Sequence, residues 1–403
     1  MAEAALFDLA RSNSVSEILA ADREIGRAKA VLSRIPGRRK IRVVALDATD
    51  TAAAARQLAG ARVVVNCAWY ELNLKAMDLA LALKAHYVDL GGLFHMTLKQ
   101  RRREPELRKA GLLAVLGCGS TPGITNMMVA RMAGDFDRID TVGIYDASHD
   151  PTQTSDSFLP PFSIRTMLDE YVMPAPVWRG GRLTEVQAHS EPETLDFPAP
   201  IGRCVAGTVI HSEVATLPGY LKAKGVKNLS FKIVYPETVK RQLAMLVAMG
   251  LDQDAPMQVN GHAVSPRRFL TALAQRSALG IGASAPGDFE VVRVRITGRA
   301  QGSALTRELD VEMRPCGPIS AGAAGVGFTA AIAAQMLAAS QVQRRSGVLA
   351  PESALQIAPF FQHLAARKVF RLVERMERHG GPIGWRERQP DPRAVRARRT
   401  SPR

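Results

Sequence analysis

The sequence has few cysteines and few aromatic residues, and each shortage narrows the possible functions. Its four cysteines, Cys67, Cys118, Cys204 and Cys316, are solitary, with no CxxC pair and no His/Cys cluster at ligand spacing. This pattern argues against a disulfide framework and a metal site, and it predicts a protein of the reducing cytoplasm. Aromatic residues make up only 5% of the chain and are not interleaved with basic ones, so a base-stacking surface for single-stranded nucleic acid is not expected.

Acidic residues are outnumbered by basic ones. Lysine and arginine number 53 and aspartate and glutamate 38, which gives a net charge of +15. Residues 386–403 hold seven arginines against Glu387 and Asp391, so a third of the surplus charge lies in one proline-containing tail. We interpret this tail as a basic disordered segment. The rest of the surplus is spread over a large globular body, so nucleic acid is not the expected partner.

Long hydrophobic runs are missing, apart from one segment. Residues 315–343 contain no charged residue, but Ala and Gly fill most of them, and Gly322 and Gly325 interrupt the first half. A membrane-spanning helix needs about twenty mostly large apolar residues. We therefore expect a buried glycine-rich turn and helix here, and no membrane contact. Glu3 and Asp8 leave no apolar stretch near the N-terminus for a secretory signal.

The first part of the chain alternates strand-like and helix-like segments with short connections. Short apolar runs predict strands at 16–21, 41–46, 62–67, 87–90 and 112–116, and periodic runs predict helices at 2–11, 71–85 and 96–110. This rhythm is typical of a doubly wound parallel sheet, so the predicted fold class is α/β.

After Gly123 the connections lengthen and become rich in Pro and Gly. Alternating strands at 231–234 and 291–296 predict an antiparallel or mixed sheet, and therefore a second domain. Periodic segments near 328–339 and 359–378 predict helices that return to the first domain.

Polar residues follow successive strands of the predicted parallel sheet. Asp22, Asp47, Asn66 and Asp89 come where four strands end, and a doubly wound sheet binds its ligand at that edge. The edge predicts a dinucleotide site, although an aspartate at a strand end is often only a turn or helix-cap residue. Asp22 favours NAD because its charge repels a 2′-phosphate, while the adjacent Arg23 leaves NADP possible.

A glycine loop that would hold the pyrophosphate is harder to find. In a dinucleotide fold it precedes the ribose-binding carboxylate by about twenty residues, and counting back from Asp22 reaches Met1. We therefore expect the first strand and the G-x-G-x-x-G loop to be missing. Gly117 and Gly119 are no substitute, because Pro122 removes a backbone N–H donor from that loop.

Several motifs in a fixed order are shared with a known family. They are 63–68 (VVVNCA), 86–92 (HYVDLGG), 117–126 (GCGSTPGITN), 161–163 (PFS) with 168–170 (LDE), 211–218 (HSEVATLP) and 347–352 (GVLAPE). Their order along residues 2–375 resembles the saccharopine dehydrogenase family, in particular the branch of lysine 6-dehydrogenase and saccharopine reductase. Family members open with a strand and a glycine loop, which this chain lacks.

The resemblance implies an NAD(P)-dependent oxidoreductase that moves a hydride to or from a carbon bonded to nitrogen, on lysine or a lysine-derived amino acid. It implies a cytoplasmic homodimer with a Rossmann-type doubly wound domain and an inserted α+β domain for substrate and dimerisation. We assign the Rossmann domain to residues 1–125, the α+β domain to 126–325, the returning helices to 326–380 and the basic tail to 386–403.

Hydride transfer at a C–N bond needs a general base with a pKa near neutrality. His211 is the first candidate, and Glu213 would orient its ring or hold an amino group. Asp89 and His95 flank Gly91-Gly92 at the end of a strand of the first domain, with Asp89 as a second catalytic candidate and His95 as a substrate-binding one. A structural histidine at 211 and a turn-capping role for Asp89 remain as alternatives.

The resemblance also places the binding residues. Asp22, Arg23, Asp47 and Ala48 would hold the adenosine end of the cofactor. Asn66, Cys67 and Ala68 would run beside its pyrophosphate or nicotinamide ribose, and the loop from Gly119 to Pro122 would close over the nicotinamide. Ser163 and Arg165 would bind the substrate, with Arg165 on its carboxylate, unless Arg165 is a solvated surface residue.

Three further hypotheses about the function remain open. Related enzymes handle polyamine precursors such as carboxynorspermidine, so the substrate class is not settled by the sequence. A non-catalytic or regulatory protein with a decayed cofactor site is the other alternative, and a nucleic-acid role for the basic tail is a third.

Overall fold

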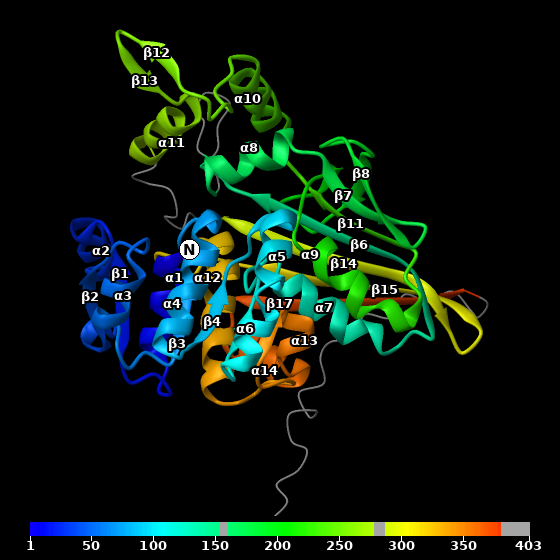
Figure 1. Ribbon diagram of the computed structural model, residues 1–403. Coiled ribbons are helices and arrows are strands. Elements are labelled where there is room, and N and C mark those ends of the chain that lie inside the picture. Colours follow the sequence, from blue (N-terminus) through cyan, green and yellow to red (C-terminus); the bar gives the residue numbers. More distant parts are fainter. Residues whose placement is uncertain (153–159, 161, 278–286, 380–403) are drawn as a thin grey trace, which may run out of the picture.

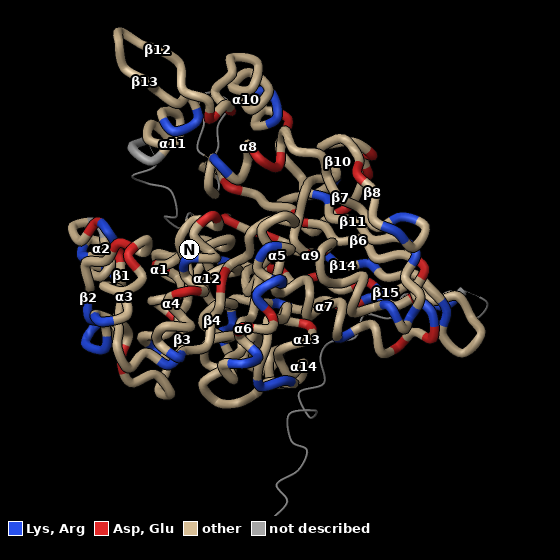
Figure 2. Tube along the Cα trace, viewed as in Figure 1, with Lys and Arg blue, Asp and Glu red and all other residues tan. Residues whose placement is uncertain are grey.

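Figure 1 shows the computed structural model of the chain, with an amino-terminal α/β domain beside a domain built on a long twisted sheet. The structure describes residues 1–152, 160, 162–277 and 287–379. The predicted basic tail, 386–403, lies outside the described residues. In Figure 2 blue and red segments are interspersed over both domains, so the basic surplus of the body forms no single stripe in that view.

The amino-terminal domain contains two parallel sheets. One pairs β1 (Ile18–Asp22) with β2 (Ile41–Ala45), and the other has the order β16-β5-β4-β3. The strands of this second sheet are β3 (Val63–Asn66), β4 (His86–Asp89), β5 (Leu113–Val115) and β16 (Gly347–Leu349). The five predicted strands are therefore present. They are split between two sheets because β1 and β3 do not pair, and a three-residue strand from far along the chain, β16, completes the second sheet.

Helices pack around these strands. They are α1 (Ala2–Arg11), α2 (Ile25–Leu32), α3 (Thr51–Gln57), α4 (Asn73–Leu83), α5 (Leu93–Arg101) and α6 (Glu104–Lys109), with 3-10 turns at η1 (Arg38–Lys40) and η2 (Tyr70–Leu72). The single helix predicted at 96–110 is two helices. Pro105 lies in the first turn of α6, where its missing N–H and fixed φ favour a new helix start over a continued helix.

The described part of the second domain contains a nine-stranded mixed sheet with the order β17-β15-β14-β6-β11-β10-β9, in which β7 also pairs with β11 and β8 pairs with β7. Its strands are β6 (Arg138–His149), β7 (Ala175–Arg179), β8 (Arg182–Val186), β9 (Glu193–Asp196), β10 (Arg203–Thr208), β11 (Asn228–Ile233), β14 (Phe289–Ala300), β15 (Ser303–Met313) and β17 (Phe370–His379). Among the described strands of this sheet only β6 and β11 pair in parallel, so the predicted mixed sheet is confirmed.

The remaining helices cover this sheet or link it to the first domain. They are α7 (Ile124–Ala133), α8 (Ile164–Val172), α9 (Glu213–Tyr220), the 3-10 turn η3 (Lys222–Lys224), α12 (Ala321–Ala338), α13 (Pro351–Ala354) and α14 (Ile357–Ala366). A separate arm projects from one end of the molecule (Figure 1). It consists of α10 (Glu237–Ala248), β12 (Met257–Val259), β13 (His262–Val264) and α11 (Pro266–Ser277).

The helix predicted at 359–378 is wrong in its second half. Helix α14 ends at Ala366, Lys368 adopts a left-handed conformation, and the chain continues as β17 along the whole of β15. The charges of this segment fit a strand because residues two apart share one face. Arg371 and Arg375 thereby lie opposite Glu312 and Glu308, and each forms an ion pair with its opposite residue.

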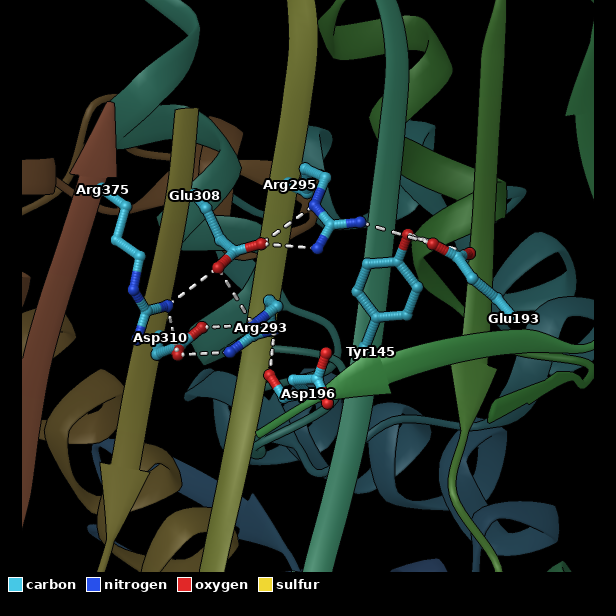
Figure 3. A network of polar contacts seen from close by, with 8 residues as sticks. All are labelled: Tyr145, Glu193, Asp196, Arg293, Arg295, Glu308, Asp310 and Arg375. Atoms are coloured by element: carbon cyan, nitrogen blue, oxygen red, sulfur yellow. Dashed lines mark hydrogen bonds and ion pairs between the residues drawn. The ribbon is translucent and has the colours of Figure 1, made fainter. Parts of the chain in front are cut away.

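An ion-pair network lies on one face of the long strands (Figure 3). The guanidinium of Arg293 on β14 donates to both carboxylate oxygens of Asp310 on β15, at 2.7 and 2.8 Å. Arg375 on β17 bonds both Asp310 and Glu308, and Arg295 bonds Glu308 at 2.8 Å. Because Asp310 is fully buried and Glu308 nearly so, each needs these cationic partners, and the network ties β14, β15 and β17 into one unit.

Helix α12 forms the central part of the charge-free segment 315–343. Among the described helices it is the one long and apolar enough to cross a membrane by length and composition, and 72% of its 18-residue window is buried inside the protein. A Cβ added to Gly327 would lie 2.5 Å from Cβ of Ala4, so glycine permits the close packing of α12 on α1. Burial in the core thus accounts for the apolar composition of this helix.

Candidate active site

A cavity of about 1790 Å³ is lined by both domains. The first domain contributes the carboxyl ends of β1 and β3, which end at Asp22 and Asn66, and the loop with Ser120 and Thr121. The second domain contributes side chains from the long sheet and from α8. The predicted edge of the doubly wound sheet therefore faces a space shared with the second domain.

Several predicted cofactor residues line this cavity. They are Asp22, Ala48, Asn66, Cys67, Ala68 and Pro122. Asn66 fixes the strip that follows β3: its Oδ1 accepts from the backbone N–H of Ala68 at 3.1 Å, and its Nδ2 donates to Asn73 at 2.9 Å. Burial raises the pKa of the Cys67 thiol to about 11, so Cys67 is a neutral packing residue there.

Three other predicted cofactor residues do not line the cavity: Arg23, Asp47 and Gly119. Asp47 is exposed and accepts two hydrogen bonds from Thr49, at 2.8 Å from its backbone N–H and 2.6 Å from its hydroxyl. These bonds hold the pKa of Asp47 below its usual value and are typical of a turn residue. Their cofactor roles stay predictions.

The loop from Gly117 to Gly123 is closed on itself. The N–H of Gly119 donates to the carbonyl of Pro122 at 2.7 Å, and the peptide bond before Pro122 is cis. Gly123 has a φ of +133°, and a Cβ there would lie 2.1 Å from the carbonyl oxygen of Gly119. The tight backbone of this loop therefore requires its glycines.

Asp89 is buried beneath this loop, with 1% of its surface exposed. Its Oδ1 accepts from the N–H groups of Gly117 at 2.7 Å and Gly91 at 3.0 Å, and its Oδ2 accepts from Gln100 at 2.6 Å. Asp89 does not line the cavity. The geometry favours a structural role that fixes two loops, which is the alternative left open by the sequence.

His211 and Glu213 form a buried pair at the cavity. Nδ1 of His211 is hydrogen-bonded to Glu213, whose other oxygen accepts from Thr125 at 2.7 Å, and the His211 ring stacks on Phe231 at 3.8 Å. Burial lowers the pKa of His211, but the carboxylates of Glu213, Glu170 and Asp146 outweigh it, so the net pKa is raised. His211 lines the cavity, and its Nε2 has no hydrogen-bond partner among the described residues. A histidine oriented in this way at a cavity can act as a general acid or base.

Three carboxyl groups outside the predicted site residues line the same cavity, and two of them, Asp146 and Glu170, are close enough to His211 to raise its pKa. Asp146 on β6, Glu170 on α8 and Glu290 on β14 all line the cavity. Thr121 donates to Asp146 at 3.1 Å, Ser120 to Glu290 at 2.9 Å and Tyr235 to Glu170 at 2.7 Å.

Burial raises the pKa of these three carboxyl groups, and no described lysine or arginine is among the groups that offset this rise. The pKa of Glu170 rises to about 7, and those of Asp146 and Glu290 also lie above their usual values. A cation bound beside these carboxyl groups would lower their pKa and stabilise their ionised form. The cluster therefore favours a positively charged ligand.

The predicted substrate residues are dispersed. Ser163 lines the cavity, but His95 is exposed and does not line it. The Arg165 guanidinium stacks on the Trp69 ring at 3.3 Å and lies 4.0 Å from Asp254. Arg165 is therefore held between the domains beside the cavity, and its contact with a substrate carboxylate stays a prediction.

Two polar atoms at the cavity are buried and have no hydrogen-bond partner among the described residues. They are Nε1 of Trp69, directly after the Asn66–Ala68 strip, and the hydroxyl of Ser212, directly after His211. Such atoms usually bind a ligand or ordered water. The residues along this edge thus fit a dinucleotide, with Trp69 on the side of the first domain and Ser212 near the acid–base pair. No cluster of metal-ligating residues occurs in the described part of the chain.

The comparison with known families agrees with this arrangement. The saccharopine dehydrogenase NADP binding domain matches residues 1–115, and the saccharopine dehydrogenase C-terminal domain matches residues 119–369. The chain belongs to the saccharopine dehydrogenase family. The family resemblance of the motifs is thereby confirmed, as is the α/β fold with an NADP-binding domain of Rossmann type and a mixed-sheet second domain. The family assignment makes the chain an oxidoreductase of NAD(P)-binding type.

Two curated proteins that are similar in sequence to this chain have names from polyamine chemistry. The chain is 25% identical to carboxyaminopropylagmatine dehydrogenase from Synechocystis sp. over 269 residues, covering 64% of this chain and 66% of that protein. It is 22% identical to carboxynorspermidine synthase from Vibrio cholerae over 286 residues, covering 66% and 68%. The alignments thus span about two thirds of each relative.

A solved structure shows the same fold. Apo saccharopine dehydrogenase (L-Glu forming) from Saccharomyces cerevisiae superposes with a TM-score of 0.69 at 18% identity, covering 93% of this chain and 97% of that one. At this identity the similarity concerns the fold alone. The match therefore supports the two-domain fold.

Proposed function

We propose that the protein is an NAD(P)-dependent dehydrogenase that acts on a C–N bond of a cationic, polyamine-type amino acid. The observation that carries this proposal is the acidic wall of the cavity. The described second-domain residues that line it include five carboxyl groups and no lysine or arginine: Asp146, Asp150, Glu170, Asp288 and Glu290. A substrate with several ammonium groups would supply the missing positive charge.

We prefer a polyamine-type substrate to lysine as the substrate class. The names of the Synechocystis and Vibrio relatives are those of enzymes for carboxylated polyamines, and the acidic wall offers more anionic partners than the single side-chain amine of lysine would use. A panel of diaminopropane, putrescine, agmatine and lysine, each offered with short aldehydes and oxo acids, tests this choice. If lysine were the only amine of the panel that supports consumption of reduced nicotinamide cofactor, this choice would be overturned.

Residues of the chain would have the following roles in binding and proton transfer. Asp22 and the Asn66–Ala68 strip would hold the dinucleotide, which supplies or accepts the hydride when bound. His211 would give a proton to, or take one from, the reacting nitrogen through Nε2, while Glu213 fixes the ring through Nδ1. Asp146, Glu170 and Glu290 would hold the ammonium groups and exclude them from water.

Removal of one carboxylate from the acidic wall should weaken binding of the amine substrate more than binding of the cofactor. We expect Glu290→Gln and Asp146→Asn each to raise KM for the best amine by about tenfold to a hundredfold, since a charged hydrogen bond contributes about 1.5–3 kcal/mol. Steady-state kinetics at saturating cofactor measure the effect. Asp140→Asn is the matched control, because Asp140 lies on the same strand β6 but pairs with Arg138 outside the cavity. Equal KM values in all variants would remove the wall from the substrate site.

Cofactor choice is tested at Asp22. Its Oδ1 accepts from the N–H of Glu24 at 2.8 Å, the side chain is exposed, and it lines the cavity at the end of β1. An Asp22→Asn variant should lose several-fold in affinity for NADH and change little for NADPH, because the carboxylate accepts ribose hydroxyls but repels a 2′-phosphate. Titrations followed by nicotinamide fluorescence give both constants. A larger loss for NADPH would reverse the assignment.

A further inference from the structure

The carboxyl groups of the acidic wall are arranged by two paired strands. Asp146 and Ser148 on β6 and Asp150 directly after it follow one another at intervals of two residues, so their side chains lie on one face. On the antiparallel strand β14, Glu290 lies opposite Ser148, and the pairing ends with the residue before Asp150 and the residue after Asp288. Asp150 and Asp288 are therefore neighbours at the ends of the two strands. All five residues line the cavity.

His211 lies at the other end of this face. Its ring stacks on Phe231 of β11, and Phe231 is opposite Ile144 of β6. Ile144 comes two residues before Asp146 and lies on the same face of β6. The carboxyl groups of the two strands therefore follow a fixed order from His211 outward: Asp146, then Glu290, then Asp150 with Asp288.

The spacing of these three levels resembles the spacing of nitrogen atoms in a linear polyamine. Neighbouring levels are about 7 Å apart, because each lies two residues further along a strand, and two steps cover roughly 13 Å. Three or four extended carbon atoms separate two nitrogen atoms by about 5–6 Å, as ordinary bond lengths dictate. Flexible Asp and Glu side chains can reach across the difference. Three successive nitrogen atoms would thus match the three levels, whereas two would leave the outermost level empty.

The outermost carboxyl groups each keep one oxygen for a ligand. Oδ2 of Asp288 accepts from the N–H of Ala321 at 2.6 Å, and Oδ1 of Asp150 accepts from the N–H and the hydroxyl of Thr152, at 2.8 and 2.7 Å. Their other oxygens have no hydrogen-bond partner among the described residues. Burial raises the pKa of Asp288, and the nearby charge of Asp150 raises it further, so a cation beside the two would be stabilising.

The inner end of the wall also has polar atoms without a partner. The hydroxyl of Ser212, a residue that is only 4% exposed, has no hydrogen-bond partner in the described part of the chain. It directly follows His211, and both residues line the cavity. Because a buried polar atom without a partner usually binds a ligand or ordered water, ligand-binding groups are present at both ends of the wall.

We propose that the acidic wall selects its substrate by length: Asp150 and Asp288 bind the terminal ammonium group of a linear triamine chain whose reacting nitrogen lies at His211. The central nitrogen would lie at Glu290, and charged hydrogen bonds would hold both ammonium groups. This inference rests on the proposed function and adds the length of the amine to it. Amines with two nitrogen atoms would reach Glu290 but not the outermost pair.

The test compares spermidine, a triamine, with putrescine, a diamine, by isothermal titration calorimetry on the full chain at about 0.15 M salt, which screens exposed charges. We expect the parent to bind spermidine at least tenfold more tightly than putrescine. The double variant Asp150→Asn/Asp288→Asn should weaken spermidine at least tenfold and putrescine less than twofold. Each asparagine keeps an oxygen that can accept the existing hydrogen bonds. Asp140→Asn on β6, outside the cavity lining, is the matched control and should change neither affinity.

The outcomes separate the length selection from the proposed function. Equal affinities of the parent for the two amines, or a preference for spermidine that survives in the double variant, would overturn the length selection and leave the amine dehydrogenase in place. If the folded parent bound neither amine, the polyamine substrate class itself would be overturned, and the length selection with it.

Discussion

A His211→Gln variant is expected to lose a factor of about 10² to 10⁴ in kcat while still binding the cofactor, since this is the usual contribution of a positioned acid–base group. The expectation rests on the cavity position of the ring, its bond to Glu213 and the absence of a described partner for Nε2. Single-turnover measurements with the amine identified by the substrate panel would separate the chemical step from binding. The matched control is His363→Gln on α14, whose ring bonds Gln341 outside the cavity.

A variant of Glu213 gives a second test of the His211–Glu213 pair. The Glu213 carboxylate raises the pKa of His211, so Glu213→Gln should lower that pKa and move the corresponding inflection of the pH–rate profile to lower pH. A purely structural histidine would give a loss of stability and no such displacement. If His211→Gln retains the parent kcat, the proton is handled by another group and the assignment fails.

An Asp89→Ala variant is expected to lose about 3–5 kcal/mol of unfolding free energy. Truncation leaves the N–H groups of Gly91 and Gly117 and the amide of Gln100 without an acceptor in a buried site, and each such group costs about 1–3 kcal/mol. Urea unfolding followed by circular dichroism measures the loss. Asp89→Asn, which keeps one oxygen, should lose less.

The control for Asp89 is a second aspartate that follows a parallel strand. Asp47 accepts hydrogen bonds from Thr49 but is exposed, so Asp47→Ala should change the unfolding free energy by about 1 kcal/mol or less. An Asp89→Ala protein that unfolds like the parent but has lost turnover would instead restore the catalytic role suggested by the sequence.

The sequence predicted features that depend on local pattern. The strands that end at Asp22 and Asn66 and the spacing of His211 and Glu213 could be recognised because each involves neighbouring residues. The short strand β16 could not be recognised, since three residues carry no periodicity, and β17 was mistaken for a helix because its partner β15 decides its conformation.

The acidic wall was missed for a different reason. Asp146 and Glu290 are far apart in the sequence and come together because β6 pairs with β14, with Asp146 opposite Val292 and Glu290 opposite Ser148. Each residue alone looks like an ordinary charged position in a strand. Only the long-range register shows that both side chains line one cavity, where their charge becomes chemically significant.

The pairing of β16 with β5 also affects how the chain matures during synthesis. In the described part of the chain the free side of β5 is covered by residues 347–349, which leave the ribosome after every strand of the long sheet except β17. Until then a nascent chain carries the first domain with an exposed strand edge, which is prone to misassociation. The two domains therefore finish folding together, and a product cut short before residue 347 should be a substrate for chaperones and proteases rather than a free-standing cofactor-binding unit.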